Sequence, residues 1–118
     1  MTIRYIGGLV LVSDDPAGLA EWYREALALP FVRQEHDTWY TMLRTHEGAV
    51  HLGISPRSLV PDASHGSSVL VTLRVDDLDA AVKRLRDHDV PVQRQQTEDG
   101  PFAFFTDPDG NRLALWGC

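Results

Sequence analysis

The feature that most constrains the fold of this chain is its last segment, residues 102–118, with the sequence FAFFTDPDGNRLALWGC. Strand-forming residues at 102–106 are followed by Asp-Pro-Asp-Gly-Asn at 107–111 and by a second apolar run at 113–116. Proline fixes φ at the start of a turn, whereas glycine and asparagine tolerate positive φ late in a turn. Two strand-like runs that flank such a turn predict a β-hairpin.

Upstream of this hairpin, residues 1–55 predict one strand, one helix and three further strands. Residues 4–13 form a strand-like run, and Asp15 followed by Pro16 is typical of a helix start, where the carboxylate caps the first turn and the proline loses no hydrogen bond. Apolar residues then recur at helical spacing until Pro30, where we expect the helix to end. The three short strands are expected at residues 31–37, 38–44 and 49–55.

The same order of elements then begins again. Residues 56–67 are rich in proline, serine and glycine, which predicts a linker. A strand-like run at 68–75 is followed by an Asp-Asp pair at 76–77 that begins a second helix with an apolar face. Further strands are expected at residues 91–95, 102–106 and 112–116. The sequence therefore predicts an α+β domain of two tandem βαβββ units. Its predicted boundaries are 1–118 for the single domain, 1–55 for the first unit and 68–118 for the second.

Composition argues against several classes of protein. The 17 acidic and 11 basic residues give a net charge of −6, which argues against nucleic-acid binding because basic surfaces supply most of that affinity. No apolar run approaches the about 20 residues that a membrane span needs, and no signal peptide is visible. The single cysteine, Cys118, excludes a disulfide within the chain. We therefore expect a cytoplasmic protein with no membrane and no nucleic-acid partner.

The closing hairpin and the order of elements together resemble the vicinal oxygen chelate superfamily, which includes glyoxalases, extradiol dioxygenases, fosfomycin-modifying enzymes and bleomycin-resistance proteins. The motif at 107–111 carries this resemblance, with a helix that ends in Trp-Tyr at 22–23 and Ala-Leu-Ala-Leu at 26–29. Family members usually have glycine at the position of Ala28. The resemblance implies that each unit forms half a barrel, and that a homodimer closes the cavities.

Metal-dependent members of this superfamily hold a divalent ion on the first and fourth strands of both units. The resemblance places these four positions at Gly8, His51, Leu70 and Ala114. First-row metal ions need about three or four protein donors, so that a single imidazole does not hold a catalytic ion. We therefore expect no metal and no cofactor at the family site. His46 and His51 do not replace it, because their spacing differs from that of the helical zinc motif.

Without a metal, the cavity of such a fold becomes a pocket with apolar walls and a few polar groups. Strand alternation directs Val10, Arg74 and Trp116 toward the cavity, and it leaves open which of Trp39 and Tyr40 faces it. The candidate ligand-binding residues are Val10, Trp39, Tyr40, His51, Leu70, Thr72, Arg74, Phe102, Phe104, Ala114 and Trp116.

We interpret the chain as a metal-independent small-molecule-binding protein, similar to the antibiotic-binding branch of the superfamily, that sequesters a planar, aromatic antibiotic or natural product. The net charge of −6 modestly favours a cationic ligand at long range. The alternative is an enzyme of the same fold, resembling a lyase, an isomerase or a dioxygenase. It would use a different metal set, or His51 as a metal-free general base. A third interpretation is an accessory interaction domain without a ligand.

Overall fold

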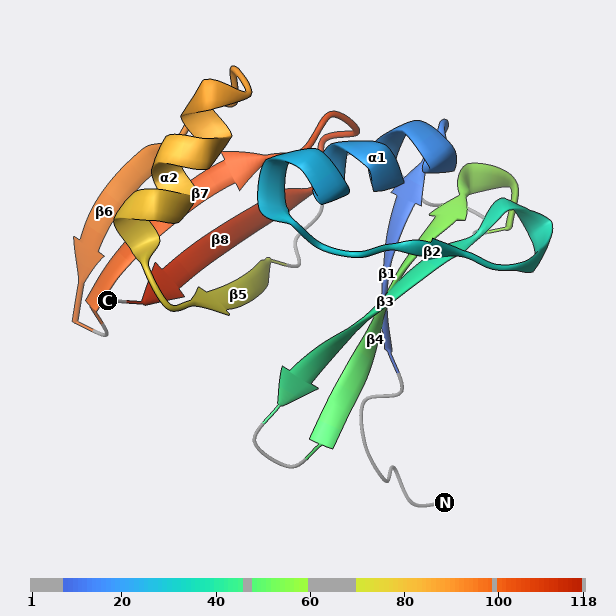
Figure 1. The fold of residues 1–118 in the computed structure, drawn as a ribbon, viewed down its shortest axis with the longest axis horizontal. Helices are drawn as coiled ribbons and strands as arrows, with labels where there is room; N and C mark the ends of the chain where they lie inside the picture. The colour runs from blue at the N-terminus through green and yellow to red at the C-terminus, as the bar shows by residue number, and fades with distance from the viewer. Residues whose placement is uncertain (1–7, 46–47, 60–69, 99, 118) are drawn as a thin grey trace. The chain divides into compact units, whose positions relative to one another are not determined.

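The structure, a computed structural model, describes residues 8–45, 48–59, 70–98 and 100–117. The chain divides after Ala63 into two compact units. Each unit folds as a four-stranded mixed sheet with one α-helix packed against it (Figure 1). This arrangement confirms the predicted α+β class and the two βαβββ units. Within the described ranges, no helix is long and apolar enough to cross a membrane.

The first unit consists of β1 (Gly8–Ser13), α1 (Pro16–Leu27), β2 (Val32–Arg33), the 3₁₀ turn η1 (Glu35–Asp37), β3 (Trp39–Thr45), β4 (Gly48–Pro56) and the 3₁₀ turn η2 (Arg57–Leu59). The strand order in the sheet is β1-β4-β3-β2, with β1 parallel to β4 and the other pairs antiparallel. A parallel pair needs a long connection between its strands, and α1 begins that connection.

The second unit consists of β5 (Val71–Val75), α2 (Leu78–Asp87), β6 (Gln93–Thr97), β7 (Gly100–Thr106) and β8 (Arg112–Gly117). Its strand order, β5-β8-β7-β6, repeats that of the first sheet, and β5 is again parallel to β8. The predicted strand residues 4–7 and 68–69, the predicted linker residues 60–67, and Cys118 lie outside the described residues.

Both helices begin at the aspartates that the sequence predicts. The carboxylate of Asp15 accepts a hydrogen bond from the amide of Gly18 at 3.1 Å, and Pro16 occupies the first turn. In the second unit, the carboxylate of Asp77 accepts from the amide of Ala80 at 3.0 Å. Each carboxylate satisfies one of the amides that a helix start leaves without a partner, which fixes where the helix begins.

The end of α1 differs from the prediction. The helix stops at Leu27, not at Pro30, because Ala28 adopts the left-handed conformation with φ of 55°. The amide of Ala28 donates to the carbonyl of Arg24 at 3.1 Å, and that of Leu29 donates to the carbonyl of Tyr23 at 3.2 Å. These two bonds satisfy carbonyls of the last turn, so the chain leaves the helix before the proline.

The strand predicted at residues 31–37 is also much shorter in the structure, where β2 contains only Val32 and Arg33. The chain turns at η1, with His36 and Asp37 at positive φ of 58° and 56°. The hydroxyl of Thr38 donates to the carbonyl of Glu35 at 2.7 Å and closes this turn. The sequence predicts a turn near Asp37, but without glycine or proline the signal is too weak to show that the turn begins at Glu35 and shortens the strand.

The hairpin between β7 and β8 forms as predicted. The amide of Gly110, whose φ is 86°, donates to the carbonyl of Asp107 at 3.0 Å. The side chain of Asp107 is only 4% exposed and accepts hydrogen bonds from the amides of Asp109 and Asn111, both at 2.9 Å. The side-chain amide of Asn111 donates to the same carboxylate at 2.8 Å. A buried carboxylate with three donors holds this turn in one conformation.

The core of each unit lies between its helix and one face of its sheet. In the first unit, Leu11, Leu52 and Ile54 are buried on the side that faces α1. In the second unit, Leu113 and Leu115 are fully buried on the side that faces α2. Each such side chain contributes about 1.5–3 kcal/mol by its removal from water. Strand alternation directs the other side of each sheet away from the helix of its own unit, and we call this side the open face.

Candidate functional site

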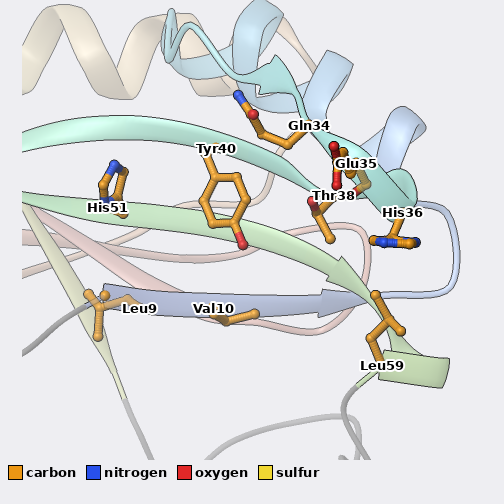
Figure 2. A pocket seen from close by; sticks show the side chains of 10 residues that line it. Leu9, Val10, Gln34, Glu35, His36, Thr38, Tyr40, His51 and Leu59 are labelled. Carbon is orange, nitrogen blue, oxygen red and sulfur yellow. Dashed lines mark hydrogen bonds between the residues drawn. The ribbon is translucent and has the colours of Figure 1, made fainter.

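A pocket of about 820 Å³ lies on the open face of the first unit (Figure 2). Tyr40 on β3 and His51 on β4 lie beside one another in this pocket, with Val10 next to them on β1. Val10 is 52% exposed although it is apolar, because the sheet turns it away from α1. The complete lining is Gly8, Leu9, Val10, Gln34, Glu35, His36, Thr38, Tyr40, His51 and Leu59.

Two glycines create the space around the central rings of this pocket. Gly8 is the β1 neighbour of His51, so no side chain from β1 crowds the imidazole. Gly53 is the β4 neighbour of Tyr40, and a Cβ atom on Gly53 would lie 2.7 Å from the Cε1 atom of the tyrosine ring. The Tyr40 ring therefore lies against the bare backbone of β4. It meets the imidazole of His51 edge-on, with ring centroids 6.1 Å apart.

The polar rim of the pocket comes from η1 and the residues beside it. Gln34, Glu35, His36 and Thr38 all line the pocket, although none of them was a candidate from the sequence. Figure 2 shows this rim at the end of the sheet where β3, the strand that carries Tyr40, begins. The rim depends on the positive φ at His36, a backbone detail that the sequence does not indicate.

Trp39 occupies the opposite side of the sheet from Tyr40. It neighbours the buried Ile54 on β4, and the guanidinium of Arg24 from α1 lies 5.3 Å from the centre of its ring. The indole Nε1 is buried and has no hydrogen-bond partner among the described residues. Of the two aromatic candidates on β3, the pocket therefore contains Tyr40, and Trp39 belongs to the side of α1.

On the open face of the second unit, three aromatic rings form one continuous row. Phe102 lies beside Trp116 with ring centroids 6.1 Å apart and an interplanar angle of 13°. Phe104 lies on the other side of Phe102, at 6.0 Å and 16°. We call Phe104, Phe102 and Trp116 the aromatic row. The guanidinium of Arg74, the β5 neighbour of Trp116, lies 4.4 Å from the centre of the indole.

The remaining sequence candidates surround this row. Ala114 is the β8 neighbour of Phe104 and of Thr72, and it is fully buried between them. Thr72 is exposed on the open face. Leu70 precedes β5 and is 43% exposed. The second unit thus contains seven of the candidates, on or beside its open face, and the pocket of the first unit brings together three.

The residues at the family metal positions do not fit a metal ion. Gly8 and Ala114 carry no donor atom, and the only imidazole among these positions is that of His51. Ala114 pairs with Thr72 on β5 as His51 pairs with Gly8 on β1, so the equivalent position on the first strand of the second unit is Thr72 and not Leu70. In the part of the chain that the structure describes, no three His, Cys, Asp or Glu side chains are grouped closely enough to hold a metal. Such ions need about three or four protein donors.

These two sheets, with one helix on each and a parallel first-to-last strand pair, agree with the family comparison. The sequence model of the glyoxalase/bleomycin resistance protein/dioxygenase superfamily matches residues 5–115. The chain belongs to this superfamily. Among curated proteins, no sequence matches this member of the superfamily.

Solved structures with the same fold cover nearly the whole chain. The antibiotic-binding protein TnmS3 from a Streptomyces species is 24% identical, covers 99% of this chain and 98% of its own, and superimposes with a TM-score of 0.76. A superfamily member from Sphaerobacter thermophilus is 19% identical, with 98% of each chain covered and a TM-score of 0.74. A protein from Agrobacterium tumefaciens is 24% identical, with 98% of each chain covered and a TM-score of 0.77. At these identities, the similarity establishes the fold.

Proposed function

We propose that this superfamily member binds a small, planar aromatic molecule without a metal ion, and that it sequesters an antibiotic or a similar natural product. The observation that carries the proposal is the aromatic row, whose three rings lie within 16° of parallel to their neighbours. All three rings are half-buried on the face of their sheet that lies opposite α2. Aromatic side chains in such a position offer a large, rigid contact area to a planar ligand.

The pocket of the first unit supports the same class of ligand. It combines apolar side chains, such as Val10 and Leu59, with the hydrogen-bonding groups of Gln34, Thr38 and His51. Its volume of about 820 Å³ lies in the range of sites for drug-sized molecules, which is about 300–1,000 Å³. The antibiotic-binding description of TnmS3, a protein of the same fold, agrees with this proposal.

A homodimer is part of this proposal. Val10 and Met42 are apolar side chains on the open face of the first sheet, and they are 52% and 54% exposed. Exposed apolar residues that gather on one surface are typical of a contact with another molecule. The family resemblance implies that this molecule is a second copy of the chain, and light scattering of the purified protein measures this directly.

The alternative function is metal-free acid–base catalysis in the pocket of the first unit. The observation that favours it is that two imidazoles, His36 and His51, and the carboxylate of Glu35 all line the pocket. A neutral imidazole can accept a proton from a bound substrate near pH 7. Mass spectrometry of a ligand after incubation distinguishes the two functions, because sequestration returns the ligand unchanged and catalysis does not.

The test of the binding function is a thermal-shift screen of planar antibiotics, followed by calorimetric titration of each compound that stabilises the protein. We expect Trp116→Ala to weaken binding about ten-fold, since a stacked aromatic pair contributes about 0.5–1.5 kcal/mol beyond the burial of its area. Trp22→Ala is the matched control, because Trp22 lies on α1 and not on an open face. Equal affinities of the Trp116→Ala variant and the wild type would contradict the proposed binding surface.

A further inference from the structure

The arginines of the second sheet are divided between its two faces. Its four strands contain three arginines and no aspartate or glutamate. Arg94 lies on the side of α2, where its guanidinium donates to the carboxylate of Asp79 at 2.6 Å. Arg74 and Arg112 lie on the open face, as β-sheet neighbours of Trp116 and Thr106. The charge on the helix side is therefore paired with a carboxylate, and the open face carries two positive charges.

Arg74 is positioned to bind a further group. Within the described ranges, its side chain forms no hydrogen bond and no ion pair, and its guanidinium lies over the indole of Trp116, with Cζ 4.4 Å from the ring centre. A guanidinium carries five N–H donors in its own plane. The indole face supplies no carboxylate or carbonyl oxygen to these donors, and the strands of this sheet carry no acidic side chain, so the donors are available to an anionic ligand. The edge of a guanidinium matches the two oxygens of a carboxylate in bidentate geometry.

We infer that the open face of the second sheet selects a planar aromatic ligand that carries a carboxylate. The ring system lies against the aromatic row, and the carboxylate accepts hydrogen bonds from Arg74. This inference rests on the proposed function and adds the charge of the ligand to it. It replaces the expectation of a cationic ligand, which came from the net charge of −6. Exposed charges are screened over about 8 Å at physiological salt, so that a contact with Arg74 outweighs distant acidic residues.

The experiment measures the affinity of the intact protein for three probes with the same ring system and different charges. These probes are anthracene-2-carboxylate, anthracene-2-carboxamide and 2-(aminomethyl)anthracene, titrated at pH 7 by fluorescence. We expect the carboxylate to bind about ten-fold more tightly than the amide, because a hydrogen bond between charged groups is about twice as strong as a neutral one. The cationic probe should bind most weakly.

The Arg74→Gln variant tests whether Arg74 causes the preference for the carboxylate ligand. The variant should lose the preference, because the affinity for the carboxylate falls about ten-fold while that for the amide changes less than about three-fold. Arg84→Gln is the matched control, because Arg84 lies exposed on α2 in the same unit and the substitution removes the same charge. This control should keep the full preference. Melting temperatures of both variants verify that they are folded.

Each outcome bears on a separate claim. A preference for the carboxylate that Arg74→Gln removes and Arg84→Gln retains supports the inference. Equal binding of the carboxylate and the amide, tighter binding of the cation, or a preference that survives in Arg74→Gln overturns the inference and leaves the proposed aromatic binding in place. Failure of all three probes to bind overturns the proposed function for planar aromatic ligands, and the inference with it.

Discussion

The first unit presents a polar pocket on its open face, where Tyr40, His51 and the η1 turn surround a space of about 820 Å³. The second unit presents the aromatic row with Arg74 at one end. Both faces nevertheless stand on the same strand order and the same parallel first-to-last strand pair. The two units thus share a scaffold and differ in the chemistry that the scaffold displays.

This difference shows which positions the fold restricts. Leu52 in β4 neighbours Leu9, and Leu115 in β8 neighbours Leu73, so that leucines occupy equivalent places under the two helices. On the open face, the position next to Leu52 is His51 and the position next to Leu115 is Ala114. Helix packing demands apolar side chains of defined volume, whereas the open face only has to suit what binds there.

The largest effect is expected from truncation of the shared core. Leu52 and Leu115 are both fully buried, and replacement of either by alanine should lower the free energy of unfolding by about 2–5 kcal/mol. Urea denaturation of each variant measures this loss. Thr72→Ala on the open face is the control and should change stability by less than about 0.5 kcal/mol. A loss below about 1 kcal/mol in one unit alone would show that the two cores are not equivalent.

The scaffold was predictable from the sequence because its signals are local. Asp15 and Asp77 cap their helices as expected, and the turn at residues 107–111 forms the expected hairpin. The predicted end of α1 and the predicted length of β2 were wrong, because Ala28 and His36 adopt positive φ without the glycine that usually signals this conformation. Sequence patterns report side-chain preference, and these two positions are decided by the hydrogen bonds of the surrounding chain.

The candidate site was predictable in part, for a different reason. Strand alternation places Val10, Arg74 and Trp116 on open faces once the helix side is known. The same rule does not decide whether Trp39 or Tyr40 lies on the open face, because these consecutive residues at the start of β3 point to opposite sides of the sheet and both are aromatic. The pocket rim at Glu35 and His36 was missed, since it depends on a turn and not on a periodic pattern.

A smaller change in the free energy of unfolding, with opposite signs in the two units, is expected from alanine-to-glycine substitutions. Ala28 ends α1 at a φ of 55°, a conformation that costs a residue with a Cβ atom about 1–2 kcal/mol. Ala28→Gly removes this cost but increases the freedom of the unfolded chain, so the protein should gain about 0.5–1 kcal/mol. Ala81→Gly within α2 should instead lose about 1 kcal/mol.

Thermal and urea unfolding of these two variants show directly whether each substitution raises or lowers the stability of the protein. The comparison is internal, because the same methyl group is removed just after the end of α1 in one variant and inside α2 in the other. If Ala28→Gly destabilised the protein, the left-handed conformation at the end of α1 would not be the state that the chain adopts in solution.

The smallest effect is expected from metal ions, which should leave the protein unchanged. EDTA, Zn²⁺, Ni²⁺ and Mn²⁺ should not shift the melting temperature, and elemental analysis should find no stoichiometric metal. An ion at 100 times its Kd would stabilise the folded state by about 2.7 kcal/mol, so a genuine site would be detected. His51→Ala should therefore behave like the wild type in this titration.

The His88→Ala variant is the control for nonspecific metal binding by an exposed histidine, since His88 lies at the exposed end of α2. One metal per chain that disappears in His51→Ala and persists in His88→Ala would contradict the metal-free interpretation. It would also mean that His51 finds further donors, because the described residues place no three His, Cys, Asp or Glu side chains close enough together to hold an ion. A single imidazole falls short of the about three protein donors that catalytic ions require.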